Sequence, residues 1–316
     1  MKFVKMQATG NDYILIEDLP AGRACRQAGR QGLQRKVARP ATLARSICQK
    51  HFGVGADGLI LILAPSPKRL WRVGDKSRVA DFRMRIFNPD GSEAEMCGNG
   101  IRCLAKLVYE RKYTRKKKLA IETASGIRAL RLFTRKGKVL RVEVNMGLPG
   151  LERDEIPMRG KGSPVLAEPV RALGKTFTAA CLSMGNPHCV IFRKNIASFP
   201  LEKYGPAIEN SPLFPQRTNV EFVKLLNRGE VEMRVWERGV GETLACGTGA
   251  AAVAVAGCLT GRTNRKIQIH PCLPAVPAGR RAGKVPGGDL EVDFRTDGCV
   301  YLTGAAEVVF EGQWLK

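Results

Sequence analysis

The stretch "ERGVGETLACGTGAAAVAVAG", residues 237–257, places one cysteine directly before a long run of small apolar residues. After Cys246 no charged residue occurs until Arg262, and helix formers dominate the run. This pattern predicts a helix that begins near residues 247–248 and is buried on most sides. Cys246 then lies at a helix N-terminus, where free N–H groups favour an anion and a thiol ionises more readily. A lone cysteine in such a place more often fills a gap in a core.

A second stretch, "FNPDGSEAEMCGNGIRCLAKLVYER" at residues 87–111, repeats this arrangement. In both stretches the cysteine follows a glutamate by four residues and precedes a Gly-x-Gly, and an aromatic residue stands ten residues before it. The matching pairs are Cys97 and Cys246, Glu93 and Glu242, and Phe87 and Trp236. We assign the two glutamates to the turn that precedes each helix.

The repetition continues outside these stretches. "TGNDYILI" around Asn11 matches "MGNPHCVIF" around Asn186, a Gly-Asn turn that leads into a β-branched strand in both cases. "ADGLILIL" from Ala56 matches "RTNVEFVKL" from Arg217 more loosely. The length of 316 residues is twice that of an ordinary domain. The sequence therefore predicts two related halves, each with a thiol at a helix N-terminus.

The chain is strongly basic, with 52 Lys and Arg against 29 Asp and Glu and a net charge of +23. Much of the excess lies in the run 111–118 and in insertions at about 21–40, 64–80 and 271–286 that lack strand or helix patterning and that no motif explains. Such a charge suits a nucleic-acid binder, so a non-enzymatic basic binding protein is one alternative. No reading motif accompanies the charge, however, and we expect only non-specific attraction to polyanions.

Several other classes are disfavoured. The sequence contains no 18-residue apolar run and no signal-peptide core, which predicts a cytoplasmic protein without a membrane span. Ten cysteines without a C-x-x-C, and only three histidines, predict no metal site. "GVGADG" at residues 53–58 matches a dinucleotide fingerprint, but a helical pattern at 41–49 precedes it and the strand "LILIL" follows. This order is the reverse of what that fingerprint requires.

Two thiols at two helix N-termini suit one kind of chemistry. A racemase or epimerase removes a proton from one face of a carbon and returns a proton to the other face, so it needs a base and an acid on opposite sides. The N–H groups at the helix ends would stabilise the charge that develops beside the reacting carbon. A duplicated fold can supply such a pair of groups from equivalent positions.

The motifs "TGNDY", "FGVGADGLI", "FNPDGSEAEMCGNGIRC", "MGNPHCV", "RTNVEFV" and "ERGVGETLACGTGA" together resemble those of the diaminopimelate epimerases, in the same order and across nearly the whole chain. The resemblance implies an isomerase that converts LL- to meso-diaminopimelate for lysine and peptidoglycan synthesis, without pyridoxal phosphate or another cofactor. It implies an α/β (α+β) fold of two pseudo-symmetric domains, each a curled, mostly antiparallel sheet or barrel around a central helix. We expect domains at 1–145 (joined by 305–316) and 146–304, an active site in the cleft between them, and a homodimer.

The resemblance also implies roles for individual residues. Cys97 and Cys246 would be the acid and base, assisted by His188 toward Cys97 and by Glu237 toward Cys246. Asn11 would hold the amine at the reacting carbon. Backbone N–H groups would hold the adjacent carboxylate, and polar side chains would fix the distal end of the substrate. The N–H groups belong to Gly98, Asn99, Gly247 and Thr248, and the distal set is Asn88, Asn186, Asn219, Glu237 and Arg238.

Some alternatives stay open. Proline and hydroxyproline racemases share the paired-cysteine plan but resemble "MCGHG" at the first site, and Asn99 argues against them. Isomerases of the phenazine-biosynthesis type lack both cysteines, whereas an epimerase of another amino acid, such as histidine, is harder to exclude. Taken singly, Asn11 and Asn186 also fit ordinary turn positions. Gly58 stands where some relatives have a glutamine, so no side chain can make that contact here.

Overall fold

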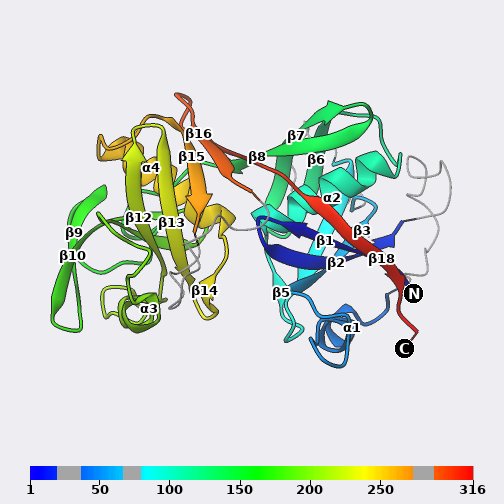
Figure 1. Ribbon diagram of the computed structural model, residues 1–316, viewed down its shortest axis with the longest axis horizontal. Coiled ribbons are helices and arrows are strands. Elements are labelled where there is room, and N and C mark those ends of the chain that lie inside the picture. The colour runs from blue at the N-terminus through cyan, green and yellow to red at the C-terminus, as the bar shows by residue number, and fades with distance from the viewer. Residues whose placement is uncertain (20–36, 67–79, 273–287, 316) are drawn as a thin grey trace. The chain divides into compact units, whose positions relative to one another are not determined.

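The computed structural model describes residues 1–19, 37–66, 80–272 and 288–315, which form four helices and 18 strands (Figure 1). The chain divides into two compact units, residues 1–144 with 305–316 and residues 145–304. The predicted mixed α/β class is confirmed. The three basic insertions at 21–40, 64–80 and 271–286 lie largely outside the described residues.

The first unit contains a mainly antiparallel sheet. Its strands are β1 (Lys2–Ala8), β2 (Asn11–Asp18), β3 (Gly58–Leu63), β4 (Phe82–Phe87), β5 (Glu93–Ala94), β6 (Lys118–Thr123), β7 (Gly126–Arg135), the first part of β8 (Lys138–Gly147), and β18 (Glu307–Gln313). The strands neighbour one another in the order β18, β1, β2, β3, β4, β6, β7, β8, and only the β2–β3 and β4–β6 pairs are parallel. The short β5 pairs with the end of β4.

The second unit repeats this order strand by strand. Its strands are β9 (Val165–Ala172), β10 (Lys175–Ser183), β11 (Pro187–Phe192), β12 (Asn219–Asn227), β13 (Glu230–Glu237), β14 (Gly241–Thr243), β15 (Lys266–Pro271), β16 (Leu290–Phe294) and β17 (Val300–Gly304). They neighbour one another in the order β9, β10, β11, β12, β13, β15, β16, β17, with β14 beside β13, and only β11–β12 and β13–β15 are parallel. The predicted pseudo-symmetry is confirmed.

The strand registers agree with the sequence repeat. Tyr13 of β2 lies opposite Gly58 of β3, as His188 of β11 lies opposite Asn219 of β12. In the next strand pair, the two aromatic residues that precede the cysteines occupy matching positions. Tyr13 is therefore the counterpart of His188, a relation that places equivalent side chains around each thiol.

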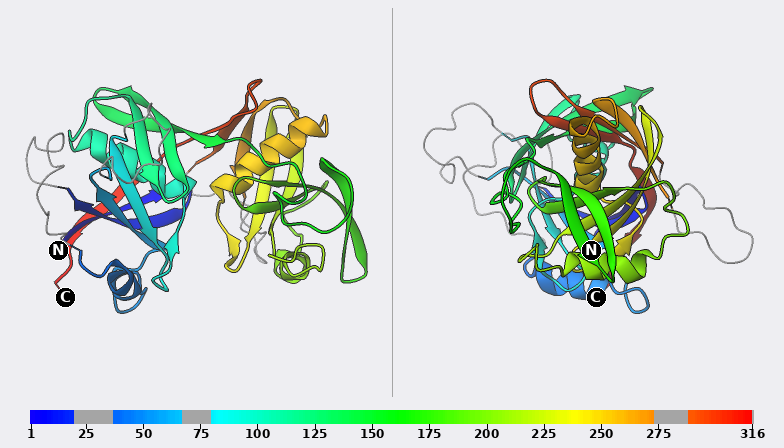
Figure 2. Two further views of the ribbon diagram at one scale, coloured as in Figure 1. Left: turned by 180° about the vertical axis from the view of Figure 1, so that it is seen from behind. Right: turned by 90° about the vertical axis from the view of Figure 1, so that its left-hand side faces the viewer.

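Each unit has one long helix packed on the inner side of its strands. Helix α2 (Gly98–Glu110) packs on β1–β4 and β7, and α4 (Gly247–Leu259) packs on β10–β12 and β15–β17. Figure 2 shows α4 with strands of its unit on either side. Nearly every residue of α4 is buried, and residues 249–257 are all glycine, alanine or valine, which allows close approach of the strands.

A shorter helix covers another part of each sheet. Helix α1 (Pro40–Ile47) packs on β3 and β4, and α3 (Leu201–Glu209) packs on β9 and β12–β14. The "GVGADG" segment forms the turn between α1 and β3, where a Cβ on Gly53 would lie 2.4 Å from the carbonyl oxygen of Ser46. This glycine permits close packing against α1, and the order of helix, turn and strand is the one that the sequence predicted.

Candidate active site

Each of the two cysteines caps the helix that follows it. Cys97 and Cys246 adopt extended backbone conformations, and each Sγ accepts a hydrogen bond from the backbone N–H three residues later, at 3.4 Å from Gly100 and from Gly249. The helices begin at Gly98 and Gly247, as the sequence predicted for the second. Both thiols therefore lie where free N–H groups and the positive end of a helix dipole gather.

An ion pair fixes the turn before each cysteine. Glu93 binds Arg85 through two bonds of 2.7 and 2.6 Å, and Glu242 binds Arg234 through two bonds of 2.7 and 3.0 Å. These pairs join β5 to β4 and β14 to β13, which confirms the turn role predicted for the glutamates. The arginines were not predicted, although each stands two residues before the aromatic residue of its repeat.

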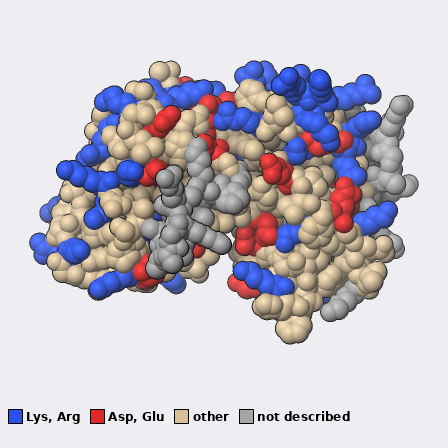
Figure 3. Space-filling view, viewed as in Figure 1, with Lys and Arg blue, Asp and Glu red and all other residues tan. Residues whose placement is uncertain are grey.

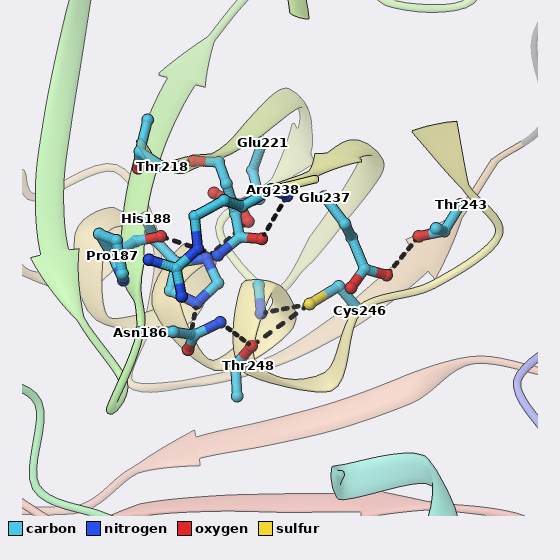
Figure 4. Close-up of polar contacts among 12 residues, drawn as sticks. Asn186, Pro187, His188, Thr218, Glu221, Glu237, Arg238, Thr243, Cys246 and Thr248 are labelled. Carbon is cyan, nitrogen blue, oxygen red and sulfur yellow. Dashed lines mark hydrogen bonds and ion pairs between the residues drawn. The ribbon is translucent and has the colours of Figure 1, made fainter. Parts of the chain in front are cut away.

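Carboxylates surround the second thiol (Figure 4). Glu237, at the end of β13, lies beside Cys246 and accepts a hydrogen bond from Thr243, and Thr248 Oγ1 lies 3.3 Å from the thiol. Burial raises the pKa of Glu237, and burial together with nearby Glu237 and Glu221 raises the pKa of Cys246 well above its usual value. The expectation that the helix end makes this thiol ionise readily is wrong, because burial and two carboxylates outweigh that effect.

A buried chain of hydrogen bonds reaches the same thiol. Fully buried His188 binds Glu221 Oε1 through Nδ1 at 2.7 Å and Asn186 Oδ1 through Nε2 at 3.0 Å. Asn186 then donates to Thr248 Oγ1 at 3.3 Å. Glu221 was not predicted, but a single acid within the apolar strand "NVEFV" is the signal that could have identified it. Among the described residues, its second oxygen has no hydrogen-bond partner.

Asn219 and Arg238 lie around the same thiol. Asn219 donates to the carbonyl oxygen of Pro187 at 2.8 Å and accepts from the backbone N–H of Arg238 at 2.9 Å. The guanidinium of Arg238 binds the carbonyl oxygen of Gln216 at 3.1 Å. The structure thus gathers seven of the predicted residues around Cys246, namely Asn186, His188, Asn219, Glu237, Arg238, Gly247 and Thr248.

The first thiol has different neighbours. The hydroxyl of Tyr13, a residue that was not predicted, lies 3.0 Å from Cys97 Sγ. Asn11 begins β2, two residues before Tyr13. Asn88 Nδ2 binds Ser92 in the turn after β4 at 2.9 Å. The side chain of Asn99 is buried at the start of α2 and accepts a hydrogen bond from an arginine of the same helix.

That arginine, Arg102, is fully buried in the first unit. It donates to the carbonyl oxygens of Gly98 and Ala305 at 3.0 and 3.2 Å, and to the side-chain oxygens of Thr9 and Asn99 at 2.8 and 2.9 Å. A single charge on the apolar face of α2 is the signal in the sequence that could have identified this residue.

The predicted assistance of Cys97 by His188 stays a prediction, since the two residues belong to different units. Among residues 1–19, 37–66, 80–272 and 288–315, no group of His, Cys, Asp and Glu is arranged to hold a metal ion. Within the same ranges, no helix combines the length and the apolar character needed to cross a membrane.

Known proteins match the chain over nearly its whole length. The family model of diaminopimelate epimerase matches residues 3–151 and 180–309. The diaminopimelate epimerases of Moorella thermoacetica and Methanococcus maripaludis are 48% and 43% identical, with 99% of this chain and 99% of each relative covered. A solved hydroxyproline epimerase from Agrobacterium vitis shares the fold, with a TM-score of 0.64 at 15% identity over 99% of this chain and 90% of that one. Because the family model and relatives of this identity both span the chain, it belongs to the diaminopimelate epimerase family.

Proposed function

We propose that this protein is an isomerase that converts LL-diaminopimelate to meso-diaminopimelate, a step toward lysine and peptidoglycan. The observation that carries the proposal is the pair of cysteines at matching helix N-termini, in a chain 48% identical to a diaminopimelate epimerase. The names of the relatives do not favour an epimerase of histidine, proline or hydroxyproline, or a nucleic-acid-binding protein.

The proposed reaction moves protons only. A thiolate removes the proton from the reacting carbon, so the C–H bond breaks and an S–H bond forms. The other cysteine gives its thiol proton to the opposite face of the same carbon. Because the charge that develops spreads into the adjacent carboxylate, we assign that group to the N–H groups of Gly98, Asn99, Gly247 and Thr248. These groups carry the reaction without pyridoxal phosphate.

We assign the remaining predicted residues to binding and assistance. Glu237 lies beside Cys246, which supports its role in moving that proton. His188 would assist Cys97, and Asn11 would hold the amine. The distal amino and carboxyl groups of the substrate would be fixed by Asn88, Asn186, Asn219, Glu237 and Arg238, a set that offers both acceptors and donors to a zwitterion.

The first prediction concerns the two thiols. Cys97→Ala and Cys246→Ala should each lower the rate of epimerisation by at least about a thousandfold, since neither face can complete the transfer alone. The assay follows meso-diaminopimelate formed from the LL isomer, and deuterium entering the product in heavy water. Cys258→Ala, which removes a half-buried thiol from α4, is the matched control and should keep near-normal activity. Near-normal turnover by either Cys97→Ala or Cys246→Ala would refute the two-thiol mechanism.

We further propose a homodimer formed through β18. Three adjacent apolar side chains of this strand, Val308, Val309 and Phe310, are 42–53% exposed, and among the described strands β18 pairs only with β1. An exposed apolar edge strand is a common pairing surface. Light scattering should give twice the mass of one chain, and Val309→Lys should lower that value, whereas a monomeric wild type would refute the proposal.

We propose the cytoplasm as the location of the protein. Nine cysteines in the described residues are free thiols, and thiols stay reduced in that compartment. Fractionation of cells that express the protein tests this assignment.

A further inference from the structure

Each half of the chain links the start of its long helix to the Gly-Asn turn that leads into a strand. In the second half the link is direct, since Asn186 Nδ2 donates to Thr248 Oγ1 at 3.3 Å. The repeat makes Asn11 the counterpart of Asn186, and Asn99 the counterpart of Thr248. In the first half the link runs through a further residue, Arg102.

Arg102 makes this link with one guanidinium group. Its Nη2 donates both to Asn99 Oδ1, at 2.9 Å, and to Thr9 Oγ1, at 2.8 Å. Asn99 is the second residue of α2, and Thr9 stands directly before the Gly-Asn turn that carries Asn11. The side chains of all three bonded residues are buried, and the other donors of the guanidinium bind two backbone carbonyl oxygens. One buried group therefore ties the first turn of α2 to the turn before β2.

The backbone at Thr9 is strained. Its φ is +54°, in the left-handed region, where a β-branched residue is rare. Such a conformation is costly and persists only where the surrounding contacts fix it. Glycine would adopt it freely, but glycine has no hydroxyl for Arg102 to bind. We attribute the threonine at this position to its bond with Arg102.

Both members of this bond are specific to the first half. The counterpart of Arg102 is Ala251, in the helix that Cys246 caps. The counterpart of Thr9 is Met184, whose side chain has no hydroxyl. The second half achieves the same link without them, because there the asparagine of the turn bonds directly to the helix start. Two different sets of side chains thus fasten equivalent segments.

We propose that Arg102, held by Thr9, is a positioning residue that keeps Asn11 and the first N–H groups of α2 at a fixed spacing. Applied to catalysis, which rests on the proposed function, these are the groups assigned to the amine and the carboxylate at the reacting carbon. Because both substrate groups are bonded to one carbon atom, the two segments that hold them must keep their relative position. Arg102 acts through these segments.

The test uses variants of Thr9, because they leave the charge of Arg102 in place. Thr9→Val removes the hydroxyl and keeps the branched shape, whereas Thr9→Ser keeps the hydroxyl. Thr9→Val should raise the KM for LL-diaminopimelate about tenfold and leave kcat within about threefold, since the looser spacing weakens substrate binding. Thr9→Ser should keep the wild-type KM. A merely structural role would instead lower the amount of folded enzyme, and with it the apparent kcat, at an unchanged KM.

Thr263→Val is the matched control. Thr263 is 3% exposed, and among the described residues its hydroxyl has no hydrogen-bond partner, so this variant should keep the wild-type KM. Arg102→Lys keeps the positive charge but loses the fork of donors, and it should raise the KM at least as much as Thr9→Val does. If Arg102→Lys does not fold, the two Thr9 variants decide.

A second measurement needs no substrate. Hydrogen exchange in the full-length protein, read by mass spectrometry, reports how often the start of a helix opens. The backbone amides of residues 101–104 in α2 should exchange about tenfold faster in Thr9→Val than in the wild type, because the first turn has lost part of its support. The amides of residues 250–253 in α4 should exchange at the wild-type rate.

Three results would overturn the inference. The first is a wild-type KM in Thr9→Val, and the second is exchange at residues 101–104 that does not respond to this variant. The third is an equal rise in KM for Thr9→Val and Thr9→Ser, since the hydroxyl would then have no part in the effect. A wild-type protein that epimerises nothing would contradict the proposed function alone, and hydrogen exchange would still test the link.

Discussion

The buried carboxyl group of Glu237 makes the stability of the folded protein depend on pH. The carboxyl group of Glu237 lies beside the buried thiol of Cys246 and near the carboxylate of Glu221, and burial raises its pKa. The folded state therefore binds the proton of Glu237 more tightly than the unfolded state does. The cost to stability is absent below the unfolded pKa of about 4.3, appears as the pH rises from there through the raised pKa, and is complete above it.

The second prediction uses this sign. Glu237→Gln should raise the melting temperature at neutral pH, because the amide keeps the bond from Thr243 and carries no charge, and the gain should vanish below about pH 4. The same variant should lower kcat by about a hundredfold if Glu237 moves a proton. Thermal unfolding at several pH values measures the first effect, and Glu202→Gln, at an exposed position of α3, is the control. A gain that persists at low pH would contradict the argument.

Some residues of the site could be predicted from the sequence and others could not. The two groups differ in where their interaction partners lie in the chain. Cys97 and Cys246 stand beside local helix signals, and the repeat of those signals made both recognisable. The partner of Tyr13 is 84 residues away, so no local pattern shows that its hydroxyl meets a thiol. Arg102 resembles a surface residue by type, and only the packing of α2 shows that it is buried.

At the scale of elements, α3 holds the loop that follows β13. Glu209 at the end of α3 accepts from Trp236 Nε1 at 2.7 Å and from the backbone N–H of Gly239 at 2.8 Å. Gly205 in the same helix lies against the ring of Trp236, where an added Cβ would come within 2.5 Å of a ring atom. The helix therefore positions the segment that carries Glu237 and Arg238.

The third prediction follows from that contact. Gly205→Ala should destabilise the protein by about 1–3 kcal/mol, because the clash with a large ring outweighs the better helix propensity of alanine. It should also lower kcat/KM by about tenfold or more, since Trp236 must move. Gly229→Ala is the control, because its Cβ would meet only the side chain of Asn227 at 3.4 Å. Equal stability of the two variants would show that Trp236 yields without cost.

The fourth prediction compares the two arginines that fix the turns. Arg234 is 2% exposed, and besides Glu242 it binds the carbonyl oxygens of Ile196 and Phe199, both at 2.7 Å. Arg85 is 21% exposed. Arg234→Lys should cost about 2–3 kcal/mol of unfolding free energy, since buried acceptors lose their donor, and Arg85→Lys less than about 1 kcal/mol. Denaturant titration measures the unfolding free energy of both variants. A larger loss for Arg85→Lys than for Arg234→Lys would contradict the prediction.

The helices that follow the two cysteines could be predicted from the sequence, but the order of the strands in each unit could not. The sequence repeat indicated two similar halves, and matched motifs such as those at Ala56 and Arg217 lie on equivalent strands. The parallel pairs β2–β3 and β4–β6 depend on connections that pass through a helix. Such crossings are set by packing between distant segments, which one sequence does not reveal.

At the scale of the molecule, positive charge dominates. Figure 3 shows Lys and Arg side chains in groups scattered over the visible face, with a dense group near β6 and β7. The run from Arg111 to Lys118 is mostly exposed. A net charge of +23 has to be screened by anions in solution.

The fifth prediction separates this charge from catalysis. The protein should bind single-stranded DNA without sequence preference at low salt and release it as salt rises toward about 0.2 M, because counterion release drives such binding. Replacing exposed Arg115 and Lys117 by serine should weaken that binding and leave epimerase activity unchanged. Fluorescence anisotropy over a salt series measures the effect. Binding that resists salt or depends on sequence would indicate a specific nucleic-acid site.

The pairing of β1 with β18 also determines the order in which the protein can fold during synthesis. Lys2 lies opposite Gln313, so β1 is made before the second unit and its outer edge stays uncovered until β18, which follows that unit, has been made. The second unit is one continuous segment, residues 145–304, and it can fold as soon as that segment leaves the ribosome. The half of the chain that is translated first is therefore the half that is completed last, and until then its unpaired edge is exposed to other chains.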